Sequence, residues 1–528
     1  MPYSNDSACE MLTTRIIKDP KSLSRPSQKL AYMSFIKKLL GPKPRIAKSE
    51  PIDVVRIKPD PMSIYKKEIE DYYIAASVEV GNTTTKCILT ATNMSTGMAQ
   101  HVNKTVRMTR DVRPPGTGEE VFGKTLTGVP LTREAVSELV AETITDCLAA
   151  VNIDIKTNLH FVVRSTGVVA GFASPEEVGI FIQALADGCL KAGVSPKNMT
   201  PAMSIDTIPD QFKKHSLITK VPFLGAVAGV LPPTGATGVE IVANEMEGEL
   251  ATAGIKEGAK WAGVDFRNPC LSLDFGTTLD GRITNSDHPY AKTIGNFCGL
   301  AGAIPDAIVQ GTGLVDPKTG TALDVFAGKQ SVGGRKRKLA EEYAEEIHEH
   351  ISIEVVPEGR ERYGSVPVDA TAAKTIGVAL IGCDVGKDGS NLPALAEIGK
   401  RIYDKHGIDM LASVMDPLAA ISVARLVQTA IDAGLVTAET AIGVTGRAGI
   451  TGNKPALILA ELIKMDFFED AENQVVFVDD GLARGAAVMA RCMNSLGVPK
   501  NPIGGNRGGG CVLAERIALQ NDEAGGWG

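Results

Sequence analysis

Closely spaced cysteine pairs are absent from this sequence of 528 residues, although it contains nine cysteines. The two nearest neighbours, Cys492 and Cys511, are 19 positions apart, so no CxxC motif occurs. Zinc ribbons and ferredoxin-type iron–sulfur clusters depend on such pairs, and neither can be assigned here. We therefore expect the cysteines to be reduced thiols within the core.

Long apolar runs are also missing, since no segment reaches the roughly 18 consecutive apolar residues that a membrane-spanning helix needs. The best candidate, 221–231, contains Pro222, is diluted by glycine and is followed by Pro232. The N-terminus lacks the apolar core of a signal peptide. These absences predict a cytoplasmic protein without a membrane span.

An excess of basic charge is lacking as well. The formal net charge is −7, whereas general nucleic-acid binders present a basic face that neutralises phosphates. Only residues 1–70 have a basic excess, with 14 Lys and Arg against 8 Asp and Glu. The same segment contains seven prolines from Pro20 to Pro61. Because proline fixes φ and disfavours helix in the preceding residue, we expect 1–70 to be an extended, loosely attached arm. No nucleic-acid partner is expected.

The sequence is rich in glycine, with 55 glycines against 29 prolines. The glycines gather in short turns beside apolar strands, which favours an α/β fold, and the length favours two lobes. We expect the first lobe at 71–265, the second at 266–500 and a glycine-rich tail at 501–528. Apolar spacing predicts helices at 134–150, 175–192, 336–351, 392–403, 417–433 and 482–496.

Two segments, 78–85 and 273–278, repeat one pattern. Each is an apolar strand that reaches an acidic residue and continues into glycine and small hydroxyl or amide residues. Such a hairpin exposes backbone N–H groups and threonine hydroxyls to phosphate. The acidic side chain, Glu79 or Asp274, can hold hydrated Mg²⁺ or orient a water molecule. Two copies, one opening each half of the chain, predict a ligand cleft between lobes.

Two later turns fit the same cleft. Segment 441–452 is a strand that runs into a glycine-rich turn, where glycine lets the backbone approach the ribose or base of adenosine. A plain strand-to-helix connection is the alternative interpretation. Segment 476–487 joins a strand and an acidic turn to a helix of small residues, which would allow close packing at a hinge between lobes.

These motifs together predict a site for ATP and Mg²⁺, although GTP would satisfy the same pattern. Asp274 and Glu79 are the predicted catalytic and Mg²⁺-binding residues. The predicted nucleotide-binding residues are Gly81, Asn82, Thr83, Thr84, Gly276, Thr277, Thr278, Gly446, Gly449, Asp479 and Gly481.

The order of the motifs resembles the ASKHA superfamily of acetate and sugar kinases, Hsp70 and actin. Within it, 274–283 followed by 299–308 is similar to the ATPase part of the reductive activators of corrinoid proteins. The chain from about residue 34 onward further resembles the methanogenesis marker protein 14 family. The resemblance implies a two-lobed actin-like (ribonuclease H-like) ATPase fold with the nucleotide between the lobes.

The resemblance also implies an activator that uses ATP to change a partner metalloenzyme of methanogenesis. Methyl-coenzyme M reductase and a corrinoid methyltransferase are the expected partners, because reducing a nickel or cobalt centre at very low potential needs an external drive. The sequence is also compatible with a homo-oligomer.

Two departures from the family pattern keep alternatives open. Glu79 stands where the first hairpin usually has Asp, and its extra methylene would displace the carboxylate. A non-catalytic ASKHA scaffold or nucleotide sensor is therefore the first alternative, and a small-molecule kinase is the second. The corrinoid activators also carry an iron–sulfur domain ahead of their ATPase lobes. This chain has only the arm there, so we expect it to pass no electrons itself.

Other residues give weaker indications. His348 and His350 lie among glutamates, but residues two apart do not share a helix face, so we expect a solvated surface and not a metal site. Segment 164–167 ends a strand in the first lobe and could face the cleft. Segment 410–415 is expected in the core.

Overall fold

The computed structural model describes most of the chain from residue 42 to residue 493. Met1–Lys43 forms a unit separate from Pro44–Gly528, and the following description concerns the second unit. The predicted tail, nearly all of 221–231 and most of 1–70 lie outside the described residues. Those described are 42–47, 72–93, 98–167, 172, 175–199, 202–203, 223–224, 245–286, 293–326, 335–364, 366–375, 377–386 and 389–493.

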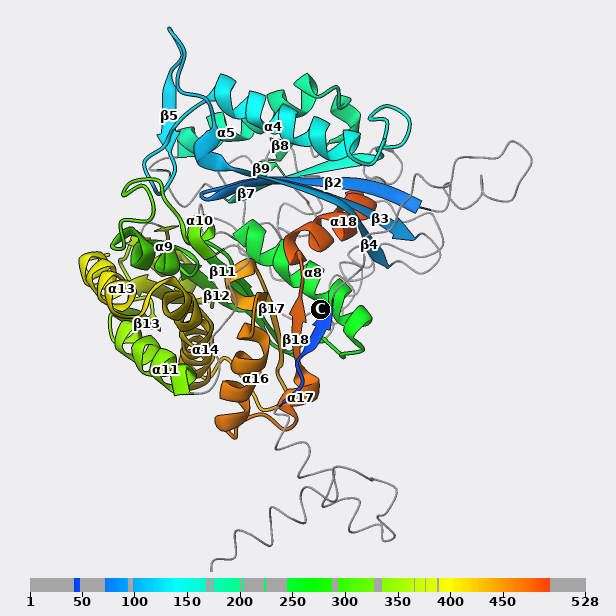
Figure 1. Cartoon of the computed structure of the whole chain (residues 1–528). Helices are drawn as coiled ribbons and strands as arrows, with labels where there is room; N and C mark the ends of the chain where they lie inside the picture. The colour runs from blue at the N-terminus through cyan, green and yellow to red at the C-terminus, as the bar shows by residue number, and fades with distance from the viewer. Residues whose placement is uncertain are drawn as a thin grey trace, which may run out of the picture. The chain divides into compact units, whose positions relative to one another are not determined.

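A four-stranded sheet, called here the small sheet, is formed by the early part of the chain (Figure 1). Its elements are β2 (Tyr72–Gly81), β3 (Thr84–Asn93), β4 (Ala99–Met108) and β7 (Phe161–Gly167), with helices α4 (Arg133–Ala149) and α5 (Pro175–Lys191). The order is β4-β3-β2-β7: β3 pairs antiparallel with both β2 and β4, whereas β7 runs parallel to β2. An apolar core lies between this sheet and the two helices, which together form the small-sheet half.

An eight-stranded sheet, the large sheet, follows in the order β1-β18-β17-β10-β11-β12-β16-β13. Its strands are β1 (Arg45–Ala47), β10 (Cys270–Phe275), β11 (Leu279–Thr284), β12 (Thr293–Gly299), β13 (Ile351–Val355), β16 (Ala379–Val385), β17 (Ala441–Thr445) and β18 (Val475–Val478). With its helices it forms the large-sheet half. Those helices are α9 (Ala303–Gln310), α10 (Ala322–Phe326), α11 (Arg335–His348), α12 (Ala370–Thr375), α13 (Leu392–His406), α14 (Ile408–Asp432), α15 (Arg447–Ile450), α16 (Lys454–Lys464) and α17 (Ala471–Gln474).

Short elements complete the described part of the chain. They are the 3-10 helices η2 (Thr109–Asp111) and η4 (Pro196–Asn198) and the two-stranded pairs β5 (Val121–Lys124) with β6 (Pro130–Thr132), β8 (Ala202–Met203) with β9 (Phe223–Leu224), and β14 (Arg362–Tyr363) with β15 (Val366–Pro367).

The two sheets share one topology. In each, a first strand forms a hairpin with the second, the second pairs antiparallel with the third, and a later strand lies parallel to the first on its other side. These sets are β2, β3, β4, β7 and β10, β11, β12, β17. The predicted α/β class is therefore confirmed, and the internal repetition indicates two related halves.

Two helices lie where the halves meet: α8 (Glu245–Ala262) and α18 (Gly481–Met493) (Figure 1). They pack so closely that a Cβ atom added to Gly254 would lie 1.7 Å from the Gly481 carbonyl oxygen. α18 contacts β2 and β3, whereas α8 packs on the large sheet beside β10 and β11. α8 ends just before the lobe boundary predicted at 265/266, and that boundary stays a prediction.

A buried ion pair holds the two helices together. The Arg484 guanidinium (α18) donates to a Glu257 carboxylate oxygen (α8) at 2.9 Å, and both side chains are nearly inaccessible to solvent. The other Glu257 oxygen accepts from the backbone N–H of Ala99, where β4 begins. This pair therefore connects both helices to the small sheet.

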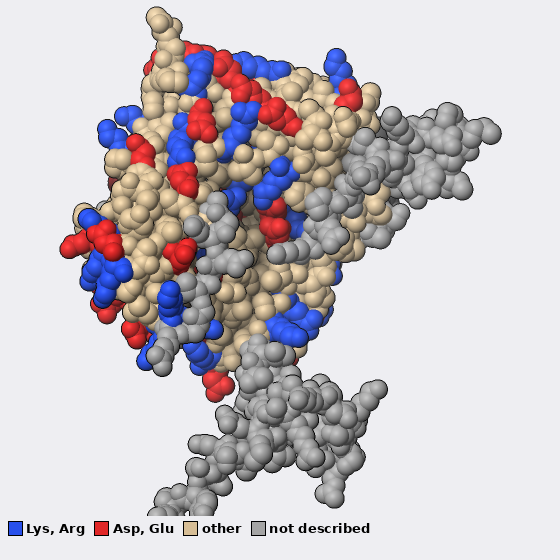
Figure 2. Space-filling model, viewed as in Figure 1, with Lys and Arg blue, Asp and Glu red and all other residues tan. Residues whose placement is uncertain are grey.

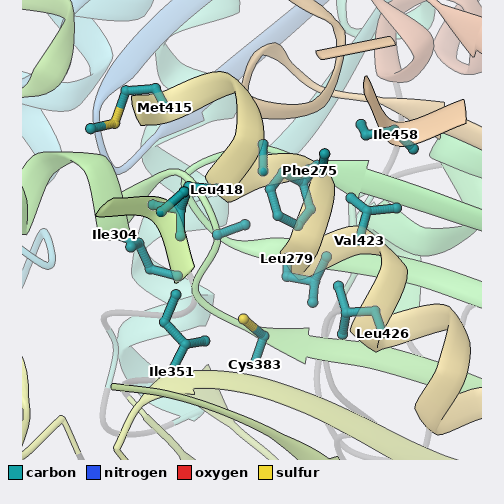
Figure 3. Close-up of a cluster of buried hydrophobic side chains, with 14 of the residues drawn as sticks. Phe275, Leu279, Ile304, Ile351, Cys383, Met415, Leu418, Val423, Leu426 and Ile458 are labelled. Carbon is teal, nitrogen blue, oxygen red and sulfur yellow. The ribbon is translucent and has the colours of Figure 1, made fainter. Parts of the chain in front are cut away.

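The main core lies between the large sheet and α14, whose residues Leu418, Val423 and Leu426 pack against the sheet (Figure 3). Among the described helices, α14 is the one long and apolar enough to cross a membrane. Its most apolar stretch of 18 residues has a mean hydropathy of 1.6, but 78% of that stretch is buried inside the molecule. α14 is thus a core helix. It begins at Ile408, nine residues before the predicted start, and places Pro417 inside the helix. Burial of its apolar residues outweighs the cost of about 3 kcal/mol for interior proline.

Part of the predicted arm belongs to the large sheet. Arg45–Ala47 forms β1, which pairs in parallel with β18 at the sheet edge, and the Asp479 backbone N–H donates to the Ala47 carbonyl oxygen at 3.2 Å. This strand was not predicted, because it is only three residues long and lies among prolines and basic residues.

His348 was wrongly predicted to lie on a solvated surface. Its side chain is buried, with 8% relative exposure, and the Arg425 guanidinium donates to its Nε2 at 2.8 Å. The sequence pattern could not show this contact, because Arg425 lies 77 positions away on α14. Burial, aided by the Arg425 charge, lowers the pKa of His348 to about 4.

We expect His348 to make stability fall with acidity. Between pH 6.5 and about 4 the unfolded chain binds a proton at this residue and the folded chain does not, so the free energy of unfolding should drop by up to about 3 kcal/mol across that window. His348→Gln should lose this part of the pH dependence. Urea unfolding at pH 7, 5.5 and 4.5 measures it, and identical slopes for wild type and variant would contradict the buried neutral histidine.

Candidate functional site

A cavity of about 660 Å³ lies between the two sheets. Its size is within the range of small-ligand sites. Both predicted hairpin turns, the turn after β17, the start of α18 and residues of α9, α10 and α14 line it. The cavity therefore collects most of the segments that the sequence singled out.

The two hairpin turns meet across this cavity. The hydroxyl oxygens of Thr83 and Thr277, 194 positions apart in the chain, lie 2.9 Å from each other and share a hydrogen bond. The seven hairpin residues predicted to bind nucleotide all line the cavity; they are Gly81, Asn82, Thr83, Thr84, Gly276, Thr277 and Thr278.

Glu79 faces a lysine that the sequence analysis did not single out. Lys86 lies directly opposite on β3, and its Nζ is 3.2 Å from Glu79 Oε2. Burial favours the neutral amine, but the charges of Glu79 and Asp274 outweigh it and hold the pKa of Lys86 above its ordinary value. Lys86 is therefore a cation at the cavity wall. Its position seven residues after Glu79, one hairpin turn away, was the signal that could have revealed it.

Asp274 lies at the end of β10 among other acidic groups. Burial raises its pKa to about 8, the charges of Asp280 and Glu79 add to this, and Lys86 opposes it. Asp280 is paired with Asp274 across the hairpin and also interacts with Glu247 of α8. Burial and Asp280 raise the pKa of Glu247 well above its usual range, and Glu247 Oε1 is buried without a hydrogen-bond partner. These four carboxyl groups, Glu79, Asp274, Asp280 and Glu247, line the cavity together, and their burial and mutual repulsion favour the protonated form of Asp274 and Glu247.

The turn after β17 approaches Asp274 directly. Gly446 has φ of +83°, and a Cβ atom there would lie 2.3 Å from Asp274 Oδ1, so only glycine fits. Gly446 lines the cavity. Gly449 does not: it packs against Val444 and Phe275, because α15 turns this residue toward the sheet.

The turn between β18 and α18 also reaches the cavity. Asp479 and Gly481 line it, and so does Asp480, which forms an ion pair with Lys104 of β4. The Gly481 backbone N–H donates to the Thr445 hydroxyl at 2.9 Å, which ties the turn to the neighbouring strand.

The remaining wall of the cavity is largely apolar. Ile304 and Pro305 of α9, Phe326 of α10 and Met415 and Leu418 of α14 line it. Figure 3 shows Ile304, Met415 and Leu418 next to one another at this edge of the core. The prediction that 410–415 lies in the core is consistent with the burial of Met410 and Met415. One end of the cavity thus suits phosphate-like polar groups and the other a flat apolar group.

Arg164 does not belong to the cavity lining. It is buried at 2% relative exposure in β7, and burial lowers the pKa of its guanidinium. The sequence suggested that 164–167 could face the cleft, but this arginine lies inside the small-sheet half.

The acidic residues fit Mg²⁺ only together with a ligand. Among the described residues, no group of three or more His, Cys, Asp or Glu side chains is arranged to hold a metal ion alone. Mg²⁺ in nucleotide sites is commonly held by one or two carboxylates and completed by phosphate oxygens and water. Asp274 and Glu79, close enough to perturb each other and beside two phosphate-type turns, suit that arrangement.

Residues 72–520 match a protein family described as "Uncharacterized protein conserved in archaea (DUF2114)". The chain belongs to this family. An uncharacterized protein of Methanothermobacter thermautotrophicus is 54% identical over 503 residues, which cover 94% of this chain and 93% of the relative. An uncharacterized protein of Methanocaldococcus jannaschii is 56% identical over 495 residues, covering 93% of this chain and 99% of the relative.

Two solved structures show distant likeness to this DUF2114 protein. One is a reductive activator for a corrinoid, iron–sulfur protein, with 12% identity and a TM-score of 0.32 over 80% of this chain; the chain spans 61% of the activator. The other is a hexokinase, with 11% identity and a TM-score of 0.33, covering 85% of this chain and 87% of the hexokinase.

Proposed function

We propose that this DUF2114 protein binds ATP with Mg²⁺ in the cavity between its sheets and hydrolyses it. The observation that carries the proposal is the meeting of two glycine- and threonine-rich hairpin turns across one cavity, joined by the Thr83–Thr277 hydrogen bond. The repeated strand order of the two halves supports the two-lobed actin-like arrangement that the sequence motifs imply.

Different residues bind the phosphates, orient the attacking water and bind the base. Backbone N–H groups and hydroxyls of the two turns bind the phosphates, and Lys86 offsets their charge. Asp274 and Glu79 orient the attacking water and would hold Mg²⁺, which would neutralise phosphate charge. The apolar wall of Ile304, Met415 and Leu418 receives the base.

The role of hydrolysis is the activation of a partner protein. The resemblance of the motifs to ATP-dependent activators and the two relatives from methanogenic archaea support a cytoplasmic metalloenzyme of methanogenesis as that partner. α8 and α18 connect the halves beside the cavity, so closure around the nucleotide can be transmitted to a bound partner. Phosphate release measured across a titration of co-purifying protein tests this role: a flat response would contradict it.

Mg-ATP should stabilise the folded protein. A ligand present at 100 times its Kd adds ~2.7 kcal/mol to the free energy of unfolding, so the melting temperature should rise by several degrees. Thermal unfolding with millimolar Mg-ATP, Mg-GTP and Mg²⁺ alone measures the effect and its base preference. An unchanged melting temperature with both nucleotides would refute the proposed function.

A further inference from the structure

One wall of the cavity is a five-residue helix, α10, that lies on the large-sheet half. Three residues of α10 line the cavity: Ala322, Leu323 and Phe326. A tight turn precedes the helix, in which Asp316 Oδ1 accepts from the backbone N–H groups of Lys318 and Thr319. Ala322 of α10 is buried in the main core and Val325 and Phe326 pack against that core, and hydrogen bonds from both halves of the molecule also hold α10 in place.

One contact attaches α10 to its own half. Asp306 of α9 accepts a hydrogen bond from the Ala322 backbone N–H at 2.7 Å. This bond fixes the first residue of α10 to the wall that Ile304 and Pro305 form.

The other contact comes from the small-sheet half. Arg110, in η2 directly after β4, donates from Nη1 to Asp324 Oδ2 at 2.7 Å and from Nη2 to Asp324 Oδ1 at 2.6 Å. Arg110 Nη1 also donates to the Thr319 carbonyl oxygen at 2.9 Å. The guanidinium thus clamps both the helix and the turn before it, across 214 positions of sequence.

This clamp has the properties of a reversible contact. A bidentate arginine–carboxylate pair is directional and stronger than a single ion pair. Both side chains are about a quarter exposed, so water can replace either partner when the pair opens. Asp324 also accepts from the Thr321 backbone N–H, which keeps its carboxylate in place when Arg110 leaves.

We propose that Arg110 and Asp324 form a latch that closes the cavity. With the pair joined, α10 seals one wall and the two halves are held together; with it broken, α10 and η2 separate and the ligand can leave. That the ligand is a nucleotide rests on the proposed function, whereas the latch itself does not.

The test uses two full-length variants and a matched control. Arg110→Met and Asp324→Asn each remove one side of the latch. Arg133→Met removes a comparable pair with Asp187 that lies within the small-sheet half, between α4 and α5. Figure 2 shows basic and acidic side chains interspersed on one face of the molecule. The Arg133→Met control therefore measures what the loss of one arginine–carboxylate pair does when that pair does not connect the two halves.

Two measurements decide the outcome. Without ligand, amide hydrogen exchange at 319–326 should be about 3- to 10-fold faster in both latch variants than in wild type and control. With a fluorescent Mg-ADP analogue, the dissociation rate should rise by a similar factor. The charge-swapped double variant Arg110→Asp with Asp324→Arg should recover part of both effects.

Unchanged exchange at 319–326 in the latch variants would overturn the latch, whether or not nucleotide binds. An equal change in the Arg133→Met control would overturn it too. Wild-type protein that binds no Mg-ADP analogue but shows faster exchange in the variants would contradict the proposed function and leave the latch supported.

Discussion

Replacing Asp274 by Asn should lower ATP hydrolysis by roughly 10²–10⁴-fold, the range for losing a positioned base or metal ligand. The substitution keeps the shape of the side chain and removes its ability to ionise, which a base or a metal ligand needs. Gly446 packs against Asp274 Oδ1, so the amide occupies the same position without displacing the turn. The measurement is steady-state phosphate release with saturating Mg-ATP.

Asp265→Asn is the matched control, because Asp265 is an exposed carboxylate paired with Arg267 just before β10. It should hydrolyse ATP like wild type. Thermal stabilisation by ATP should largely survive in Asp274→Asn, since the hairpin turns and Lys86 remain. An unchanged turnover in Asp274→Asn would show that the catalytic carboxylate lies elsewhere in the acidic group.

Gly254→Ala should cause the largest loss of stability, about 3 kcal/mol or more. The added Cβ would lie 1.7 Å from the Gly481 carbonyl oxygen and 2.8 Å from the Gly485 backbone nitrogen. These contacts are with backbone, which cannot rotate away, so α8 and α18 must move apart. Because Gly481 lines the cavity, ligand binding should weaken as well.

Gly179→Ala provides the comparison, since it makes the same change inside helix α5 where an added Cβ meets nothing within 4 Å. Alanine has a higher helix propensity than glycine, so this variant should gain about 0.5–1 kcal/mol. Urea unfolding of both variants measures the difference. Equal stabilities would rule out the close approach of the two helices.

The two hairpins could be predicted because their information is local. Glycine, threonine and an acidic residue within eight positions determine a turn and the groups it exposes, as in Gly81 and Gly276. Six helices were predicted for the same reason, from apolar spacing inside one segment, whereas α8 was missed. The errors arose where the neighbour was distant in sequence: His348 contacts Arg425, and β1 pairs with β18.

By itself, then, the sequence determined the α/β class, both glycine- and threonine-rich hairpin turns, the glycine at 446 and the acidic residues that end the first strand of each hairpin. Only the tertiary structure decided that Glu247 joins Asp274 and Asp280, and that Arg110 reaches Asp324. The physical reason is that burial and electrostatic interaction depend on distances in space. The pKa of Asp274 reaches about 8 because β10 buries its carboxyl beside charges from β2, β3 and β11, and no single segment contains that set.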